Sequence, residues 1–321
     1  MVQSDNLFNR FLPDEKAKVA ALSVLSNTIL VVFKLIAGLM INSVSVISEA
    51  IHSGLDLVAA MIAFFSVRTS SQPPDERHRY GHGKIENISG TIEAILIFIA
   101  AVWIILEAYK KIVLGSTVET VGVGLVIMAI SAVMNLIIST LLMKTARKTD
   151  SVALEADALH LRTDVYTSLG VFIGLAALEI TKIQIFDPII AIAVALMIIK
   201  AAYDLTVKAF VPLLDVSLPG EEEAEITNIL ELLRAEGKLV DYHKLRTRRA
   251  GRERHVDLHV VVPRNHPIHE VHQLCDQIEE DIEKRLPASN VLIHAEPCQD
   301  KYCSLCRSCP GNFSQLQNKE R

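Results

Sequence analysis

Long runs of apolar residues dominate the first two thirds of the chain. Six of them reach the roughly 20 residues that a helix needs to cross a bilayer core. We place these spans at 19–41, 45–67, 85–109, 118–143, 151–180 and 186–210. The pattern predicts a polytopic α-helical membrane protein in which residues 19–210 form six transmembrane helices in the lipid bilayer, preceded by a polar segment at residues 1–18.

After Phe210 the pattern becomes that of a water-soluble domain. Two segments repeat apolar residues at helical spacing, namely Ile226, Ile229, Leu230 and Leu233, then Val271, Leu274, Cys275, Ile278 and Ile282. Strand-like runs lie at 241–249, 254–262 and 291–295. The order helix, strand, strand, helix, strand predicts an α+β domain of the ferredoxin-like αββαβ type at residues 211–297, followed by a Cys-rich tail at 298–321.

Composition and charge add an orientation to this picture. The chain is 50% hydrophobic and has a net charge of −5, without the basic patch that nucleic-acid binding requires. Lys and Arg gather in the connections after spans two and four, at Arg68, Arg77, Arg79 and Lys84, then at Lys144, Arg147 and Lys148. Because basic loops stay on the cytoplasmic side, we expect both termini in the cytoplasm.

Two of the predicted spans carry ionisable residues where hydrocarbon makes them costly. Span two holds His52 and Asp56, and span five holds His160 and Asp164. Each pair is four residues apart and therefore shares one helix face. At a rise of about 1.5 Å per residue, the two pairs lie at similar depths in antiparallel helices. The spacing predicts a four-ligand site; the alternative is two local hydrogen bonds that hold the bundle together.

The chemistry of this ligand set favours one class of cation. Two imidazoles and two carboxylates suit tetrahedral Zn²⁺, and suit Mg²⁺ or Mn²⁺ less well; Cd²⁺, Co²⁺ and Fe²⁺ are further candidates. An imidazole binds metal only when it is neutral, so protons and metal compete for it near neutral pH. That competition is what a metal:proton antiporter requires. The single acids Glu49, Glu93 and Glu155 are expected near helix ends, wetted or supporting.

With these features in view, the chain resembles the cation diffusion facilitator family, and within it the YiiP-type bacterial zinc/iron efflux transporters. The resemblance rests on the paired ligands, on the "RYGHGKIE" loop before span three and on the α+β domain, and it covers residues 12–298. It implies a homodimer in the inner membrane that is not an enzyme. The implied activity is export of Zn²⁺ from the cytoplasm in exchange for protons, by alternating access.

The resemblance also carries over individual residues. His52 stands where YiiP-type members have aspartate, which favours zinc over iron. In the loop it implies a second metal site at Asp75, His78 and His82, where the alternative is a solvated polar loop. In the soluble domain it implies a binuclear regulatory or structural Zn²⁺ site at His243, His259, His272, His294 and Glu296, the last replacing the family's aspartate. Lys84 and Asp215 are implied to form a salt-bridged hinge.

Four cysteines follow the soluble domain, at Cys298, Cys303, Cys306 and Cys309. Because a cytoplasmic tail is reducing, disulfides are not expected there. The spacing of the first three also matches that of plant-type ferredoxins, but no other feature implies a redox role. A structural or regulatory Zn²⁺ site is one interpretation, and unliganded thiols on a loose tail are the other.

Two other functions are compatible with these residues. One is a membrane metal sensor that transports nothing, although a sensor needs no ligands at mid-bilayer. The other is an intramembrane metalloenzyme. Catalytic zinc keeps one position open for water, whereas this quartet would fill four, and the HExxH motif is missing from the sequence.

Overall fold

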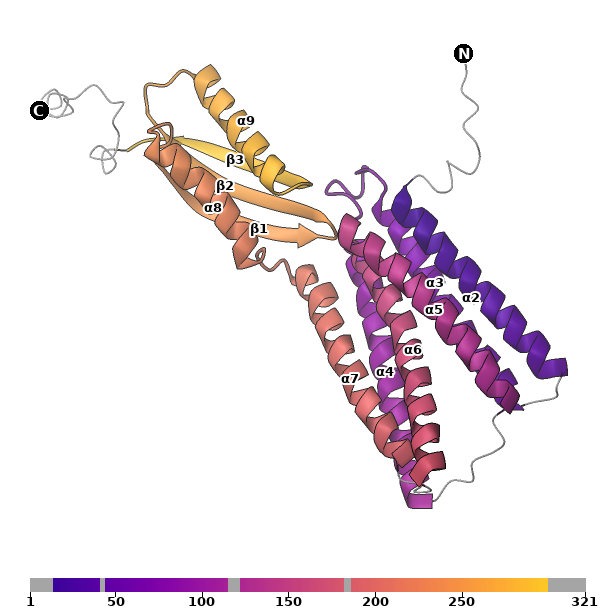
Figure 1. The fold of residues 1–321 in the computed structure, drawn as a ribbon. Coiled ribbons are helices and arrows are strands. Elements are labelled where there is room, and N and C mark those ends of the chain that lie inside the picture. Colours follow the sequence, from indigo (N-terminus) through magenta and orange to yellow (C-terminus); the bar gives the residue numbers. More distant parts are fainter. Residues whose placement is uncertain (1–13, 41–43, 115–121, 182–185, 300–321) are drawn as a thin grey trace, which may run out of the picture. The chain divides into compact units, whose positions relative to one another are not determined.

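A computed structural model describes residues 14–40, 44–114, 122–181 and 186–299 of the chain, which divides into two compact units at Leu214. The first unit contains the helices α2 (Glu15–Met40), α3 (Val44–Ser70), α4 (Lys84–Leu114), α5 (Gly122–Thr149), α6 (Val152–Thr181) and α7 (Phe186–Phe210), then the short 3-10 helix η1 (Val211–Leu214) (Figure 1). The second contains α8 (Gly220–Ala235), β1 (Asp241–Ala250), β2 (Glu253–Val262), α9 (Ile268–Arg285) and β3 (Ser289–Pro297).

The predicted fold class is confirmed, and several helices of the first unit extend beyond their apolar runs at one end or both. Helix α2 starts at Glu15 rather than Val19, because Oδ1 of Asp14 accepts the backbone N–H of Ala17 at 2.9 Å and caps the first turn. Helix α5 continues to Thr149, with Arg147 and Lys148 in a last turn whose dipole favours positive charge. In these two helices, capping and terminal charge thus carry the helix past its apolar run.

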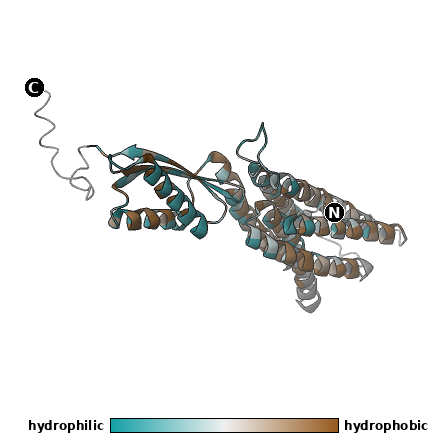
Figure 2. Ribbon diagram, turned by 90° about the horizontal axis from the view of Figure 1, so that it is seen from above, coloured by the Kyte–Doolittle hydropathy of each residue, from teal (hydrophilic) through white to brown (hydrophobic). Residues whose placement is uncertain are grey.

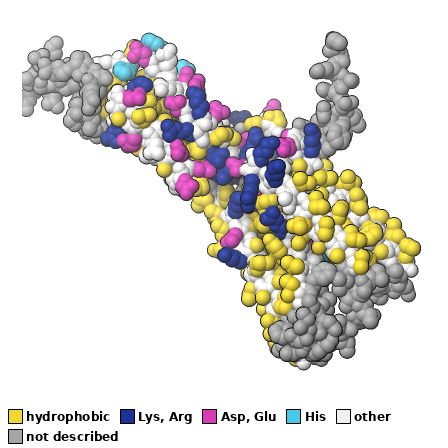
Figure 3. Space-filling view, in the orientation of Figure 1, with side chains coloured by type: hydrophobic (Ala, Val, Ile, Leu, Met, Phe, Trp, Pro, Cys, Tyr) yellow, Lys and Arg dark blue, Asp and Glu magenta, His cyan; other side chains and the backbone are white. Residues whose placement is uncertain are grey.

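Five of these helices are long and apolar enough to cross a membrane: α2, α3, α4, α5 and α7. Only the described residues bear on this count, and in α6 the first half carries Glu155, Asp157, Arg162 and Asp164. Figures 2 and 3 show hydrophobic residues over most of the visible bundle, which suits contact with lipid. Charged residues at such positions in a membrane helix need partners inside the bundle.

Small residues let the helices of the bundle approach one another. Buried alanines line the contacts of several helices, at Ala59, Ala60, Ala63, Ala94, Ala101, Ala156, Ala195, Ala202 and Ala209. A Cβ added to Gly90 of α4 would lie 2.9 Å from Cγ1 of Val152 and 3.2 Å from Cβ of Ala209. Since lipid offers no hydrophobic drive for helix association, close packing of this kind is a main source of stability.

A buried carboxylate ties four helices together at one end of the bundle. The carboxylate of Glu86, on α4, accepts Lys16 Nζ of α2 at 2.9 Å and Ser70 Oγ of α3 at 2.6 Å. Its other oxygen accepts Ser151 Oγ, which precedes α6, at 2.5 Å. Both Lys16 and Glu86 are buried. This network fixes the spacing of α3 and α6, the two helices that carry the predicted ligands.

The second unit is a three-stranded sheet covered by two helices. The strand order is β1-β2-β3, with β1 antiparallel to β2 and β2 parallel to β3. Alternation along β2 buries Val256, Leu258 and Val260 in the core that α8 and α9 complete. The helix, strand, strand, helix, strand order predicted from periodicity is confirmed. The opposite face of the sheet carries the other set of side chains, including His259.

The core of the second unit leads to a stability prediction. Because this core is built from residues of the unit itself, the fragment 215–321 should fold alone. Replacing the buried Leu258 by Ala should lower its free energy of unfolding by about 3 kcal/mol, through lost burial and a residual cavity. Urea denaturation followed by circular dichroism measures the change.

The matched control for that substitution is Leu292→Ala on the neighbouring strand. Leu292 is 67% exposed, so its loss should change the free energy of unfolding by less than about 0.5 kcal/mol. Equal losses in the two variants would contradict the core described above.

Candidate metal centres

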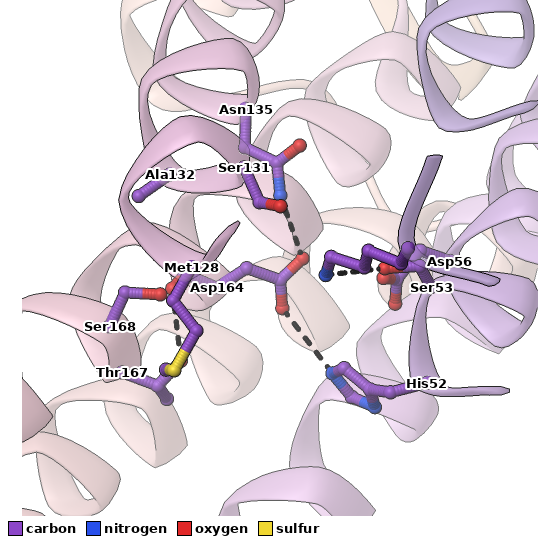
Figure 4. A pocket seen from close by; sticks show the side chains of 11 residues that line it. His52, Ser53, Asp56, Met128, Ser131, Ala132, Asn135, Asp164, Thr167 and Ser168 are labelled. Carbon is purple, nitrogen blue, oxygen red and sulfur yellow. Dashed lines mark hydrogen bonds and ion pairs between the residues drawn. The ribbon is translucent and has the colours of Figure 1, made fainter. Parts of the chain in front are cut away.

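The ligand pairs predicted on spans two and five lie on α3 and α6 and meet between these helices. Nε2 of His160 lies 3.2 Å from Oδ1 of Asp56. Nε2 of His52 lies 3.8 Å from Oδ1 of Asp164 (Figure 4). Each histidine thus faces the aspartate of the other helix. One ligand atom from each of His52, Asp56 and Asp164 lies within 4.8 Å of the others, a spacing that one cation can bridge.

A cavity of about 70 Å³ opens beside these residues, and His52, Asp56 and Asp164 line it. It has room for a small ion with some of its water. Ser131 and Asn135 line it from α5 (Figure 4). Nδ2 of Asn135 donates to Oδ2 of Asp164 at 3.2 Å and so orients this carboxylate. The sequence prediction missed Asn135, although an amide within an apolar run could have signalled it.

Lys34 is a second residue of this cavity that the prediction missed. It is the only charged residue in the predicted span 19–41. Its side chain is buried, and Nζ donates to Oγ of Ser53 at 2.8 Å. A lone charge in a membrane span is a signal of function in its own right.

Glu93 does not lie where the sequence prediction put it. Of the two expected roles, contact with water is wrong, because Glu93 is fully buried in the third turn of α4, while a supporting role stays a prediction. There its Oε1 accepts a hydrogen bond from Ser89 Oγ at 3.4 Å, and Asp157 of α6 is also fully buried. The helix begins at Lys84, so the turn that holds Glu93 is packed inside the bundle. Glu155 is partly exposed and pairs with Lys208 at 2.6 Å, while the side chain of Glu49 lies outside the described residues.

The loop before α4 brings its three predicted ligands together. Asp75 Oδ1 lies 3.2 Å from Nδ1 of His78, and Asp75 Oδ2 lies 3.3 Å from Nε2 of His82. One atom from each of the three residues falls within 4.8 Å of the others. The backbone N–H groups of His78 and Arg77 donate to Asp75 and lower the pKa of its carboxyl group. An ionised carboxylate with two imidazoles is a suitable ligand set for Zn²⁺.

A third cluster lies on the face of the sheet opposite the helices. His243, His259 and His294 are neighbours in the register of β1, β2 and β3. Nδ1 of His259 lies 2.7 Å from Oε1 of Glu296, and Nε2 of His243 lies 3.5 Å from Oε2. The hydrogen bond from His259 lowers the pKa of Glu296. His243, His259 and Glu296 form a group that could hold one ion, with His294 3.8 Å from Glu296.

His272 does not join this cluster within one chain. It lies on α9, exposed, with Nδ1 3.4 Å from Oδ1 of Asp276. The reason is the layering of the unit, because α9 covers the core face of the sheet and the other histidines lie on the opposite face.

The cysteine tail falls mostly beyond the described residues, which exclude Cys303, Cys306 and Cys309. Cys298 is described and is buried with Val240 and Val261, and its N–H donates to the carbonyl of Val262 at 2.8 Å. Its position is that of a core thiol at the end of β3.

The predicted hinge pair, Lys84 and Asp215, joins residues of different units and stays a prediction. Lys84 is the first residue of α4. Within the second unit, Oδ1 of Asp215 lies 3.5 Å from a guanidinium nitrogen of Arg248.

Comparison with known proteins agrees with the class that this architecture suggests, a membrane transporter of cations. Residues 20–214 match the family model described as the cation efflux transmembrane domain, and residues 218–298 match the cation efflux protein cytoplasmic domain. The chain therefore belongs to the cation efflux, or cation diffusion facilitator, family. Its members are transporters, so the metalloenzyme alternative is set aside.

Individual relatives span most of the chain. An uncharacterised transporter of Synechocystis is 32% identical over 83% of this chain and 86% of its own length. The cation-efflux pump FieF of Yersinia pestis is 31% identical over 88% of this chain and 93% of its own. A solved structure of CzrB, a candidate zinc transporter, aligns over 26% of this chain and 100% of the CzrB chain. The two are 36% identical there, with a TM-score of 0.25. That score is too low to bear on fold or cargo.

The sheet cluster leads to a binding prediction. Isothermal titration of the fragment 215–321 with Zn²⁺ should detect binding, and His259→Ala should weaken it at least about tenfold, because His259 orients Glu296 and offers its own nitrogen. The control is His269→Ala, an exposed histidine of α9 outside every described cluster, which should bind as the wild type does. If the wild-type fragment, His259→Ala and His269→Ala bind Zn²⁺ with equal affinity, the sheet cluster is not the binding site.

Proposed function

We propose that the protein exports Zn²⁺ from the cytoplasm in exchange for protons, with His52, Asp56, His160 and Asp164 as the transport site. The observation that carries the proposal is the pair of crossed contacts between α3 and α6, His160 with Asp56 and His52 with Asp164. Two nitrogen and two oxygen ligands match the four-coordinate, tetrahedral preference of Zn²⁺, and Cd²⁺, Fe²⁺ and Co²⁺ are the next candidates.

Charge balance is the reason to couple this cargo to protons. Two carboxylates with two neutral imidazoles carry a charge of −2, which is expensive away from water. A divalent cation neutralises that charge, and so do protons taken up by the same groups. A carrier that alternates between these two neutral forms keeps the cost of burial low in both. Exchange of metal for protons by alternating access follows from this balance.

The loop and sheet clusters are assigned to regulation and structure in this proposal. Both offer histidine and carboxylate ligands at the end of the bundle or on the soluble unit, where the cytoplasmic supply of metal would reach them. The match of residues 218–298 to a family domain associated with dimers supports a homodimer. Because His272 lies apart from the cluster in one chain, its use as a ligand would need a second copy.

The proposal also specifies a location and an orientation. The chain is a multi-pass membrane protein of a family with bacterial members, and we assign it to the inner membrane. The basic residues at the ends of α5 and α7, Arg147, Lys148 and Lys208, support cytoplasmic termini by the positive-inside rule. A membrane sensor that transports nothing is less favoured, because the family consists of transporters.

The first test is transport by the purified full chain in proteoliposomes. Zn²⁺ uptake should rise when a pH gradient supplies protons on the opposite side. His160→Ala should lower the uptake rate at least about 100-fold, because it removes a ligand and leaves Asp56 buried without its partner. His269→Ala is the matched control and should transport normally. Uptake by His160→Ala at the wild-type rate would refute the site, and uptake insensitive to the gradient would refute proton exchange.

A second test concerns the choice of metal. His52→Asp creates a set of one imidazole and three carboxylates, which suits oxygen-preferring cations better than Zn²⁺. The ratio of Zn²⁺ to Fe²⁺ or Mn²⁺ uptake, measured in the same vesicles, should fall by about tenfold or more. His269→Ala, which alters an exposed histidine outside the described clusters, should leave that ratio unchanged. A ratio that His52→Asp does not alter would mean that selectivity lies elsewhere.

A further inference from the structure

A positively charged side chain lines the same cavity as the proposed cation ligands. Lys34 of α2 is 4% exposed, and the cavity that it lines is also lined by His52, Asp56 and Asp164. Its Nζ donates to Ser53 Oγ at 2.8 Å. Ser53 is itself buried and lies between His52 and Asp56 on α3. The hydrogen bond therefore holds the ammonium group next to two of the proposed ligands.

Charge explains why an ammonium group can be buried there. A hydroxyl group such as that of Ser53 satisfies one N–H donor but carries no opposite charge. The acidic groups that line the cavity with Lys34 are Asp56 and Asp164, and the α5 residues that line it, including Ser131 and Asn135, are neutral. Among the described residues that line the cavity, the carboxylates of the proposed cargo site are the groups that can offset the charge of Lys34.

The same carboxylates cannot serve two cations equally well at once. A divalent ion bound between α3 and α6 would lie in a cavity that already holds a positive charge, and repulsion in such a poorly hydrated place is strong. Lysine has four methylene groups and a compact charged head, so Nζ can move while the backbone of α2 stays in place. Helix α2 packs against both α3 and α5, which fixes where that lysine is anchored.

We propose that Lys34 is a tethered cation that competes with the cargo for Asp56 and Asp164. It offsets one of their two negative charges before the metal binds, and the metal must displace it. The competition weakens cargo binding and thereby speeds release, so Lys34 is a positioning residue that sets the affinity of the transport cycle. The inference rests on the proposed transport site but goes beyond it, since neither the ligand set nor proton exchange requires a lysine.

The test compares Lys34→Met with the wild-type full chain in proteoliposomes, with Zn²⁺ as the cargo. Methionine keeps much of the length of the side chain and removes the charge. The Zn²⁺ concentration that gives half-maximal uptake should fall about tenfold or more, and the maximal rate should fall as well, because release becomes slow. Lys34→Arg retains the charge and should keep both values within about threefold of wild type.

Two further variants make the result interpretable. Lys34→Gln is a second neutral side chain, used with Lys34→Met so that poor folding of one variant does not decide the outcome. Lys18→Met removes an exposed lysine from the same helix and should leave both values unchanged. The proposal is overturned if neither neutral variant lowers the half-saturating concentration, or if Lys34→Arg behaves as they do. Failure of the wild type to transport Zn²⁺ would instead refute the proposed function.

Discussion

A charge removed from water needs a partner, and the transmembrane unit depends on where its buried charges find one. Glu86 is satisfied by Lys16, Ser70 and Ser151, three groups from three other parts of the bundle. Asp56 is satisfied by His160 across the gap between α3 and α6. Because each such group would be costly to bury alone, these contacts select one packing of the helices among the many that apolar surfaces would allow.

The constraint that selects the packing also supplies the chemistry. A carboxylate and an imidazole that satisfy each other in the bundle are the same groups that can hold a metal ion or a proton, so a structural contact doubles as a candidate binding site. The clusters at Asp75 and at Glu296 use similar residues where water is near, and their burial costs far less. Identical ligand types therefore suit transport in one place and regulation in the other.

Most of the architecture could be predicted from periodicity, and so could the four ligands on α3 and α6, whereas the loop and sheet ligands were implied by the family resemblance. The spans, the order of elements in the soluble unit and the placement of His52 and Asp56 on one helix face all follow from spacing along one helix or strand. Periodicity failed for Glu93, because the depth of a residue in a bundle depends on where its helix begins and what covers it. Periodicity also did not identify Lys34 and Asn135. These residues line the ligand cavity only because α2 and α5 pack beside α3 and α6.

The sequence by itself determined the class of protein, since apolar runs of spanning length and ionisable residues four apart each have a local cause that no tertiary contact can reverse. Only the tertiary structure decided which histidine faces which aspartate, that a lysine shares their cavity, and that His272 lies apart from the other histidines of its unit. These outcomes depend on the order in which separate helices and strands pack. Packing is set by the shapes and charges of many surfaces together, which no single stretch of sequence contains.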